Sequence, residues 1–155
     1  MRRAIKLLIV QLNSSARTRK GKIMREIMFR GKRVDNGKWV FGDLIHGVNA
    51  KLGKFYILPV ECGVTSLKDC DPLDGYNVDP ATVGQFTGLL DSADVKIFDG
   101  DFVEDIALGG AGMVYWHPDS ASFYYGMGGT SLVHNKELVV IGNIHDNPEL
   151  MEESK

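Results

Sequence analysis

The sequence of 155 residues has few cysteines and no long apolar run. Its two cysteines, Cys62 and Cys70, have seven residues between them, which matches no metal or redox spacing, and two cysteines make a poor disulfide framework. No apolar stretch approaches the roughly 20 residues that a membrane-spanning helix needs. We therefore expect a cytoplasmic protein with reduced thiols and no place in the membrane.

The net charge of the sequence is small, at −2, but the charged residues are unevenly distributed along the chain. Residues 1–33 hold eleven basic side chains and one acid, a net charge of +10, whereas residues 34–155 hold seven basic side chains and nineteen acids, a net charge of −12. A basic end is typical of nucleic-acid binding, but an acidic body repels phosphate. Non-specific binding along nucleic acid is therefore disfavoured. A nucleic-acid contact limited to the basic end of the chain stays possible as an alternative.

Residues 1–23 form a basic N-terminal extension. The longest apolar run in it, Leu7–Val10, is shorter than the roughly 7–15 residues of a signal-peptide core, so we expect no secretion signal. Met24 is a second candidate initiator. We expect a disordered extension upstream of the real start; the alternative is a basic arm that binds an acidic partner.

The sequence is rich in glycine, with 18 residues against an average near ~7%, which favours many turns between short strands. Asn36-Gly37 predicts a type I′ hairpin turn leading into a strand over residues 38–45. The strand that starts at Phe55 should end at Pro59 or lie at a sheet edge there, because proline lacks the ladder donor. Asp79-Pro80 predicts a capped helical turn.

These patterns predict a mainly β fold, α+β only through short helical turns, in two lobes. Residues 24–77 should form an N-terminal β-hairpin lobe that ends in a joint loop over residues 61–77. Residues 78–155 should form a C-terminal SH3-like small β-barrel lobe. Most strand aromatics, including Trp39, Phe41 and Trp116, are expected in the core.

Five ordered blocks of the sequence resemble one family, the YopX-like proteins of bacteriophages and prophages. The resemblance spans residues 25–151, and its blocks cover residues 25–32, 37–44, 78–89, 97–103 and 140–148. Asp94 stands where the family usually has glycine, and aspartate tolerates the left-handed conformation better than most residues. The resemblance implies a mainly β fold, a mobile-element origin and the cytoplasm of a bacterial host, but no established biochemical activity.

The sequence contains no recognisable catalytic constellation. There is no G-x-S-x-G motif, and the glycine clusters at residues 109–112 and 126–129 lack the Lys-Ser/Thr pair of a P-loop. Asp99 and Asp101 flank a glycine corner, where carboxylates usually accept backbone hydrogen bonds. We therefore predict that the protein is not an enzyme and uses no cofactor.

Metal binding is also unsupported. The stretch Asp69–Gly75 resembles a calcium loop, but its acids fall at positions 1, 3 and 6, and Pro80 stands where such a loop has glutamate. The four histidines have no ligand spacing. We predict a solvated acidic loop and no metal.

Two hypotheses for function remain. The leading one is a non-enzymatic interaction module that binds a protein partner or itself, using the turn-rich loops at residues 61–77 and 126–131. The alternative is a nucleic-acid-binding protein that uses the basic hairpin at residues 25–33 and the N-terminal arm. The candidate binding residues are Arg25, Arg30, Lys32, Arg33, Trp39 and Gln85. Each has a structural interpretation, in which the cations pair with the acidic body and Gln85 tethers a loop.

Overall fold

The computed structural model describes residues 25–46, 54–59, 76–132 and 137–153. The predicted 1–23 extension, residues 61–75 of the joint loop and the Asp69–Gly75 stretch lie outside these ranges. The predicted mainly β fold is confirmed, since the described elements are β1 (Phe29–Lys32), β2 (Trp39–His46), β3 (Phe55–Pro59), β4 (Asn77–Val78), the 3-10 turn η2 (Pro80–Thr82), β5 (Gly84–Leu90), β6 (Lys96–Phe98), β7 (Asp101–Asp105), β8 (Ala111–His117), β9 (Ser122–Tyr125), β10 (Thr130–Ser131), β11 (Leu138–Asn143) and α2 (Leu150–Glu153).

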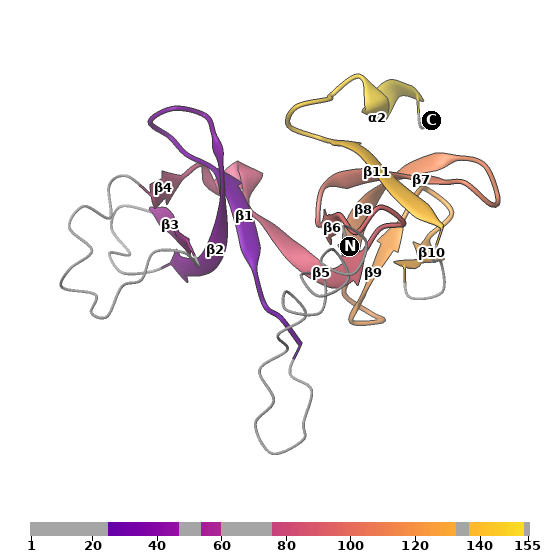
Figure 1. Cartoon of the computed structure of the whole chain (residues 1–155), viewed down its shortest axis with the longest axis horizontal. Helices are drawn as coiled ribbons and strands as arrows, with labels where there is room; N and C mark the ends of the chain where they lie inside the picture. The colour runs from indigo at the N-terminus through magenta and orange to yellow at the C-terminus, as the bar shows by residue number, and fades with distance from the viewer. Residues whose placement is uncertain (1–24, 47–53, 60–75, 133–136, 154–155) are drawn as a thin grey trace, which may run out of the picture.

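The strands form two antiparallel sheets that have no strand in common (Figure 1). The first sheet has the order β4-β3-β2-β1-β5-β6, and the second has the order β10-β9-β8-β7-β11. Strand β5 begins beside β1, with Gln85 opposite Phe29, and ends beside β6, with Leu90 opposite Lys96. It therefore runs from the hairpin side of the molecule to the side that carries the second sheet.

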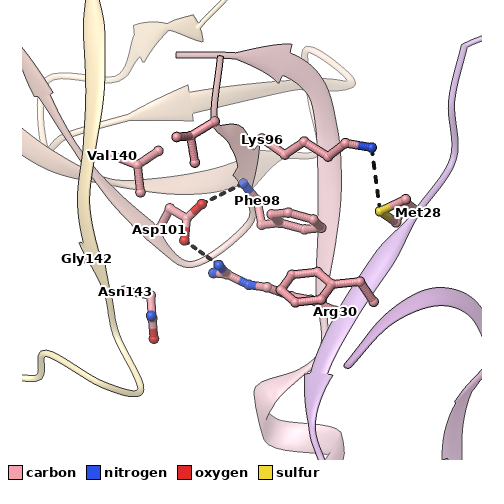
Figure 2. Close-up of a pocket in the computed structure, with 10 residues that line it drawn as sticks. Met28, Arg30, Lys96, Phe98, Asp101, Val140, Gly142 and Asn143 are labelled. Atoms are coloured by element: carbon pink, nitrogen blue, oxygen red, sulfur yellow. Dashed lines mark hydrogen bonds and ion pairs between the residues drawn. The ribbon is translucent and has the colours of Figure 1, made fainter. Parts of the chain in front are cut away.

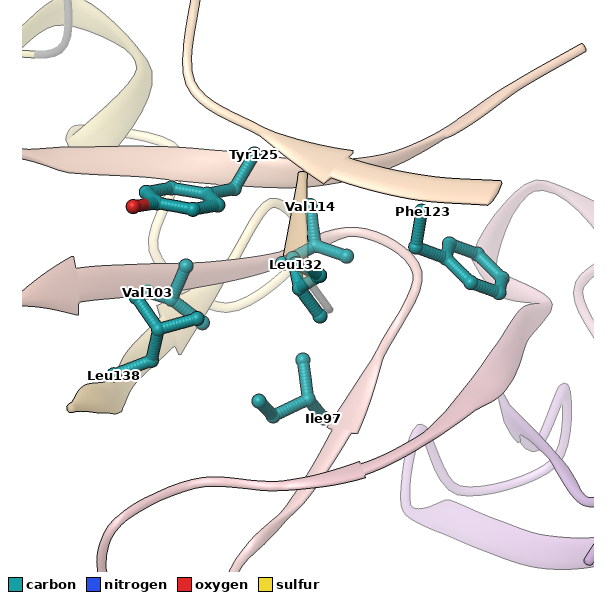
Figure 3. Close-up of a cluster of buried hydrophobic side chains, with 7 residues drawn as sticks. All are labelled: Ile97, Val103, Val114, Phe123, Tyr125, Leu132 and Leu138. Atoms are coloured by element: carbon teal, nitrogen blue, oxygen red, sulfur yellow. The ribbon is translucent and has the colours of Figure 1, made fainter. Parts of the chain in front are cut away.

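Each part of the molecule has its own apolar core. Near the first hairpin, Val40, Ile57 and Val78 are buried together. The second core joins Ile97 of β6 to buried residues of the second sheet and its loops; its members are Ile97, Val103, Val114, Phe123, Tyr125, Leu132 and Leu138 (Figure 3). The predicted boundary between residues 77 and 78 falls inside β4, and both the two-lobe division and the SH3-like barrel stay predictions.

The turn of the first hairpin differs from its prediction. Arg33 N–H donates to the Lys38 carbonyl and Gly37 N–H to the Arg33 carbonyl, both at 2.9 Å, so four residues rather than two close the loop. Gly37 has a φ of 68°, but Asn36 is not among the described residues with positive φ. The type I′ prediction was therefore wrong, because that turn needs two left-handed residues and this loop uses one.

Other local predictions are confirmed. Asp79 caps η2 by accepting a 3.0 Å hydrogen bond from the Ala81 N–H, with Pro80 at the first position of the turn. Pro59 is the last described residue of strand β3, so the predicted end of that strand stays a prediction. Asp94 has a φ of 63°, the left-handed conformation expected where the family usually has glycine. In the described residues, no helix has the length and apolar character needed to cross a membrane.

Candidate functional site

A pocket of about 430 Å³ lies where the two sheets meet (Figure 2). We call it the inter-sheet pocket. Its walls come from strands β1, β2, β6, β7 and β11 and from the residues directly before β1 and β6. The lining residues are Met28, Arg30, Phe41, Val95, Lys96, Phe98, Asp101, Val140, Gly142 and Asn143.

Arg30 forms one wall of the inter-sheet pocket and is only 7% exposed. Its Nη1 is 2.5 Å from Asp101 Oδ1, and its Nη2 donates to the Asp99 carbonyl at 3.2 Å. The guanidinium stacks on two rings, 4.8 Å from the centre of Trp39 and 5.0 Å from that of Phe98. These contacts fix a cation from the first hairpin against the start of the second sheet.

The backbone around Arg30 explains why it fits there. Arg30 lies opposite Gly84 in the pairing of β1 with β5. A Cβ at Gly84 would stand 2.5 Å from the Asp99 carbonyl oxygen, so a glycine is needed for the close approach of the carbonyl that accepts from Arg30. Among the described residues, that Nε has no hydrogen-bond partner.

Of the two aspartates beside Arg30, Asp101 forms the ion pair, and Asp99 contributes its backbone carbonyl. Asp101 Oδ2 accepts a 2.7 Å hydrogen bond from the Phe98 N–H, while the other oxygen faces Arg30. Burial raises the pKa of Asp101, and the Arg30 charge opposes that change. Burial also raises the pKa of Asp99, again against the pull of Arg30. The pocket therefore holds a buried ion pair and not a group of unpaired carboxylates.

The opposite side of the pocket is apolar and open to solvent. Phe41 is 45% exposed and lies 5.6 Å, centre to centre, from the ring of Phe98. Val95 is 48% exposed. Lys96 closes one side, with its Nζ 4.9 Å from the ring centre of Phe86 and 2.6 Å from Glu26 Oε1. This arrangement presents a hydrophobic hollow that can receive an apolar group.

A second set of polar contacts ties the end of β11 to the first hairpin. Asp146 accepts hydrogen bonds from Trp39 Nε1 at 2.7 Å and Asn143 Nδ2 at 2.9 Å, and it pairs with Lys32 Nζ at 2.5 Å. These donors, Lys32 first, hold the pKa of Asp146 well below its ordinary value. His145 packs 5.9 Å from the ring of Trp39. The turn after β11 is thus fastened to the hairpin beside the pocket.

The family described as YopX protein matches residues 28–152 of this sequence. The chain belongs to the YopX family. A solved structure, the crystal structure of protein EF1440 from Enterococcus faecalis, is similar to this YopX family member with a TM-score of 0.50 and 18% sequence identity. The match covers 83% of this chain and 99% of that one, and at this identity it supports the fold alone. Among proteins with curated descriptions, none matches the chain.

The candidate residues named from the sequence do not share one exposed surface in this YopX family member. Arg30, Lys32 and Trp39 come together, but as parts of the contacts between sheets. Arg33 pairs with Asp35 in the hairpin loop. Arg25 contacts β5, where it donates to the Thr87 carbonyl at 3.2 Å. Gln85 belongs to β5, and its carbonyl accepts from the Asp99 N–H.

Sequence reasoning missed most of the apolar pocket wall. The strand pattern predicts Phe41 and Trp116 in the core, but Phe41 is 45% exposed and Trp116 is 44% exposed. A signal for Phe41 is present in the sequence, because buried Val40 precedes it and exposed Asp43 stands two residues later on the same strand face. In the described residues, no three His, Cys, Asp or Glu side chains gather as metal ligands.

Proposed function

We propose that this YopX family protein is a non-enzymatic interaction module that binds a protein partner through the inter-sheet pocket. The observation that carries the proposal is the exposed wall made by Phe41 and Val95. Large exposed apolar side chains around a hollow are typical of binding surfaces. The family resemblance supports a phage-derived protein in the bacterial cytoplasm.

The chemistry of the pocket supports binding over catalysis. The guanidinium group of arginine has hydrogen-bond donors and no acceptor, so Arg30 does not act as a base. Asp101 is committed to Arg30 and to the Phe98 N–H. A general acid or base needs freedom to reach a substrate proton, and both charged groups are instead held by neighbours.

Nucleic-acid binding is the weaker candidate because the basic hairpin has little unpaired charge. Arg30, Lys32 and Arg33 each lie within ion-pair distance of an aspartate. Contacts with phosphate would have to replace these pairs. A gel shift with duplex DNA and single-stranded RNA across a salt series tests this alternative, which requires binding that weakens steeply as salt increases.

Partner capture from a bacterial lysate tests the proposal. The tagged full chain is compared with Phe41→Ser and with the control Leu108→Ser, which changes a leucine that is 80% exposed outside the pocket. We expect the native chain and the control to retain the same protein, and Phe41→Ser to lose it while its circular dichroism is unchanged. Light scattering checks self-association in the same three proteins. Background capture together with monomeric protein would contradict the proposal.

A further inference from the structure

Carboxylates stand beside the exposed wall of the inter-sheet pocket. Asp43 follows Phe41 by two residues on the same face of β2, and Asp94 directly precedes Val95. Both residues are exposed. None of the ion pairs among the described residues involves either aspartate. Each of these exposed carboxylates therefore lies within two residues of a side chain in the exposed wall and adds negative charge near it.

The cations of the pocket do not offset this charge. Arg30 is paired with Asp101, and Lys96 is paired with Glu26. The wider molecule has the same sign, because residues 25–155 contain 11 basic and 20 acidic side chains, a net charge of −9. Such a field attracts cationic partners and repels anionic ones such as nucleic acid.

The apolar wall also suits the side chains that carry positive charge. Arg30 stacks 5.0 Å from the ring centre of Phe98, and Lys96 lies 4.9 Å from that of Phe86. Phe41 offers a further ring, and nearly half of its surface is exposed. Arginine and lysine bind aromatic faces through their charge and through their aliphatic stems.

We propose that the inter-sheet pocket docks a basic segment of a partner protein, with an apolar side chain inside the pocket and lysines or arginines at Asp43 and Asp94. This inference rests on the proposed function and names the chemistry of the partner. A volume of about 430 Å³ lies within the range of roughly 300–1,000 Å³ for ligand pockets. The apolar group supplies affinity, and the two carboxylates select the charge of the segment.

Three synthetic peptides test the inference against the isotope-labelled full chain by amide chemical-shift titration. One is basic with an apolar centre, acetyl-GKRLFRKG-amide; the second inverts its charge, acetyl-GEDLFDEG-amide; the third lacks the apolar centre, acetyl-GKRGSRKG-amide. We expect only the first to bind measurably, with shifts at Phe41, Val95, Lys96 and Val140. Its affinity should fall as salt increases, because the charges of Asp43 and Asp94 are exposed.

Variants of the full chain separate the two parts of the site. Phe41→Ser should raise the Kd of the basic apolar peptide by about tenfold, the loss of one central contact. The double change Asp43→Asn and Asp94→Asn should raise it by about fivefold and reduce its dependence on salt. The matched control, Glu104→Gln with Asp119→Asn, removes two exposed carboxylates outside the pocket lining and should leave the Kd unchanged.

The outcomes also separate this inference from the proposed function. Tighter binding of the acidic peptide, equal binding of both charged peptides, or shifts confined to other residues would overturn the basic-segment inference. If the peptides fail while lysate capture remains sensitive to Phe41→Ser, the interaction module stands and the partner chemistry is wrong. If both fail, the pocket is not an interaction site.

Discussion

Arg30 joins the first hairpin to the second sheet by charge, hydrogen bonding and ring stacking at once. Its partners in these contacts are Asp101, the Asp99 carbonyl, and the rings of Trp39 and Phe98. Burying an ion pair costs the desolvation free energy of both charges, and their mutual attraction only partly offsets that cost. The pair therefore specifies how the sheets meet more than it adds net stability, and removing one member leaves the other charge buried alone.

Arg30→Ala should reduce the free energy of unfolding by about 3–5 kcal/mol, because it leaves the Asp101 carboxylate buried without its counter-charge. Urea denaturation measures the loss. Arg33→Ala is the matched control: it removes an ion pair of the same two residue types, but in an exposed hairpin loop, where such pairs contribute below about 1 kcal/mol. Equal effects of the two changes would contradict the buried role of Arg30.

Asp99 provides a test of pH dependence. Burial raises its pKa, so the folded state disfavours the ionised carboxylate. A group whose pKa is raised by folding gives its full contribution to stability below the unfolded pKa and loses it as pH rises through the folded pKa. Asp99→Asn should therefore be more stable than the native chain at about pH 7, and the difference should close at about pH 3. A difference that widens on acidification, measured by urea denaturation, would contradict the direction of this pKa change.

At the scale of elements, one close approach between strands decides whether the first sheet can form. Gly42 in β2 faces Pro59 in the pairing of β2 with β3. A Cβ at this position would lie 1.9 Å from the Leu58 carbonyl oxygen. No side chain can occupy that space unless the two strands separate.

Gly42→Ala should consequently cost about 1–3 kcal/mol or more, the range for overpacking in a well-packed region. Gly128→Ala is the control, since a Cβ at that position would meet no atom within 4 Å and its φ is not positive. The midpoints of thermal unfolding compare the two variants. A Gly42→Ala variant as stable as the Gly128→Ala variant would show that β2 and β3 can move apart at little cost.

The elements also show where sequence reasoning succeeds and where it stops. Short-range chemistry was predictable, because the Asp79 cap and the left-handed Asp94 each depend on neighbouring residues. The partners of Arg30 were not, because the residue whose carbonyl it binds is 69 positions away. The exposure of Phe41 was also missed, because burial of a strand face depends on which distant part of the chain covers it.

At the scale of the whole molecule, strand pairing, a buried ion pair and a set of polar contacts among the described residues join the two cores. Strand β5 pairs with β1 near its start and with β6 farther along. The Arg30–Asp101 pair crosses beside it, and Asp146 after β11 binds Lys32 and Trp39 of the hairpin. A local opening of either part would break several of these contacts together, which favours one cooperative transition.

The two tryptophans allow this cooperativity to be measured, because Trp39 belongs to the first sheet and Trp116 to the second. In Trp116→Phe the remaining fluorescence reports the hairpin, and in Trp39→Phe it reports β8. For each variant we expect the urea midpoint from fluorescence to coincide with that from far-ultraviolet circular dichroism in the same sample. Trp39→Phe should lower both midpoints, because it removes the Asp146 hydrogen bond at 2.7 Å. Midpoints that separate in either variant would mean that β5 and the contacts around Arg30 do not couple the two cores.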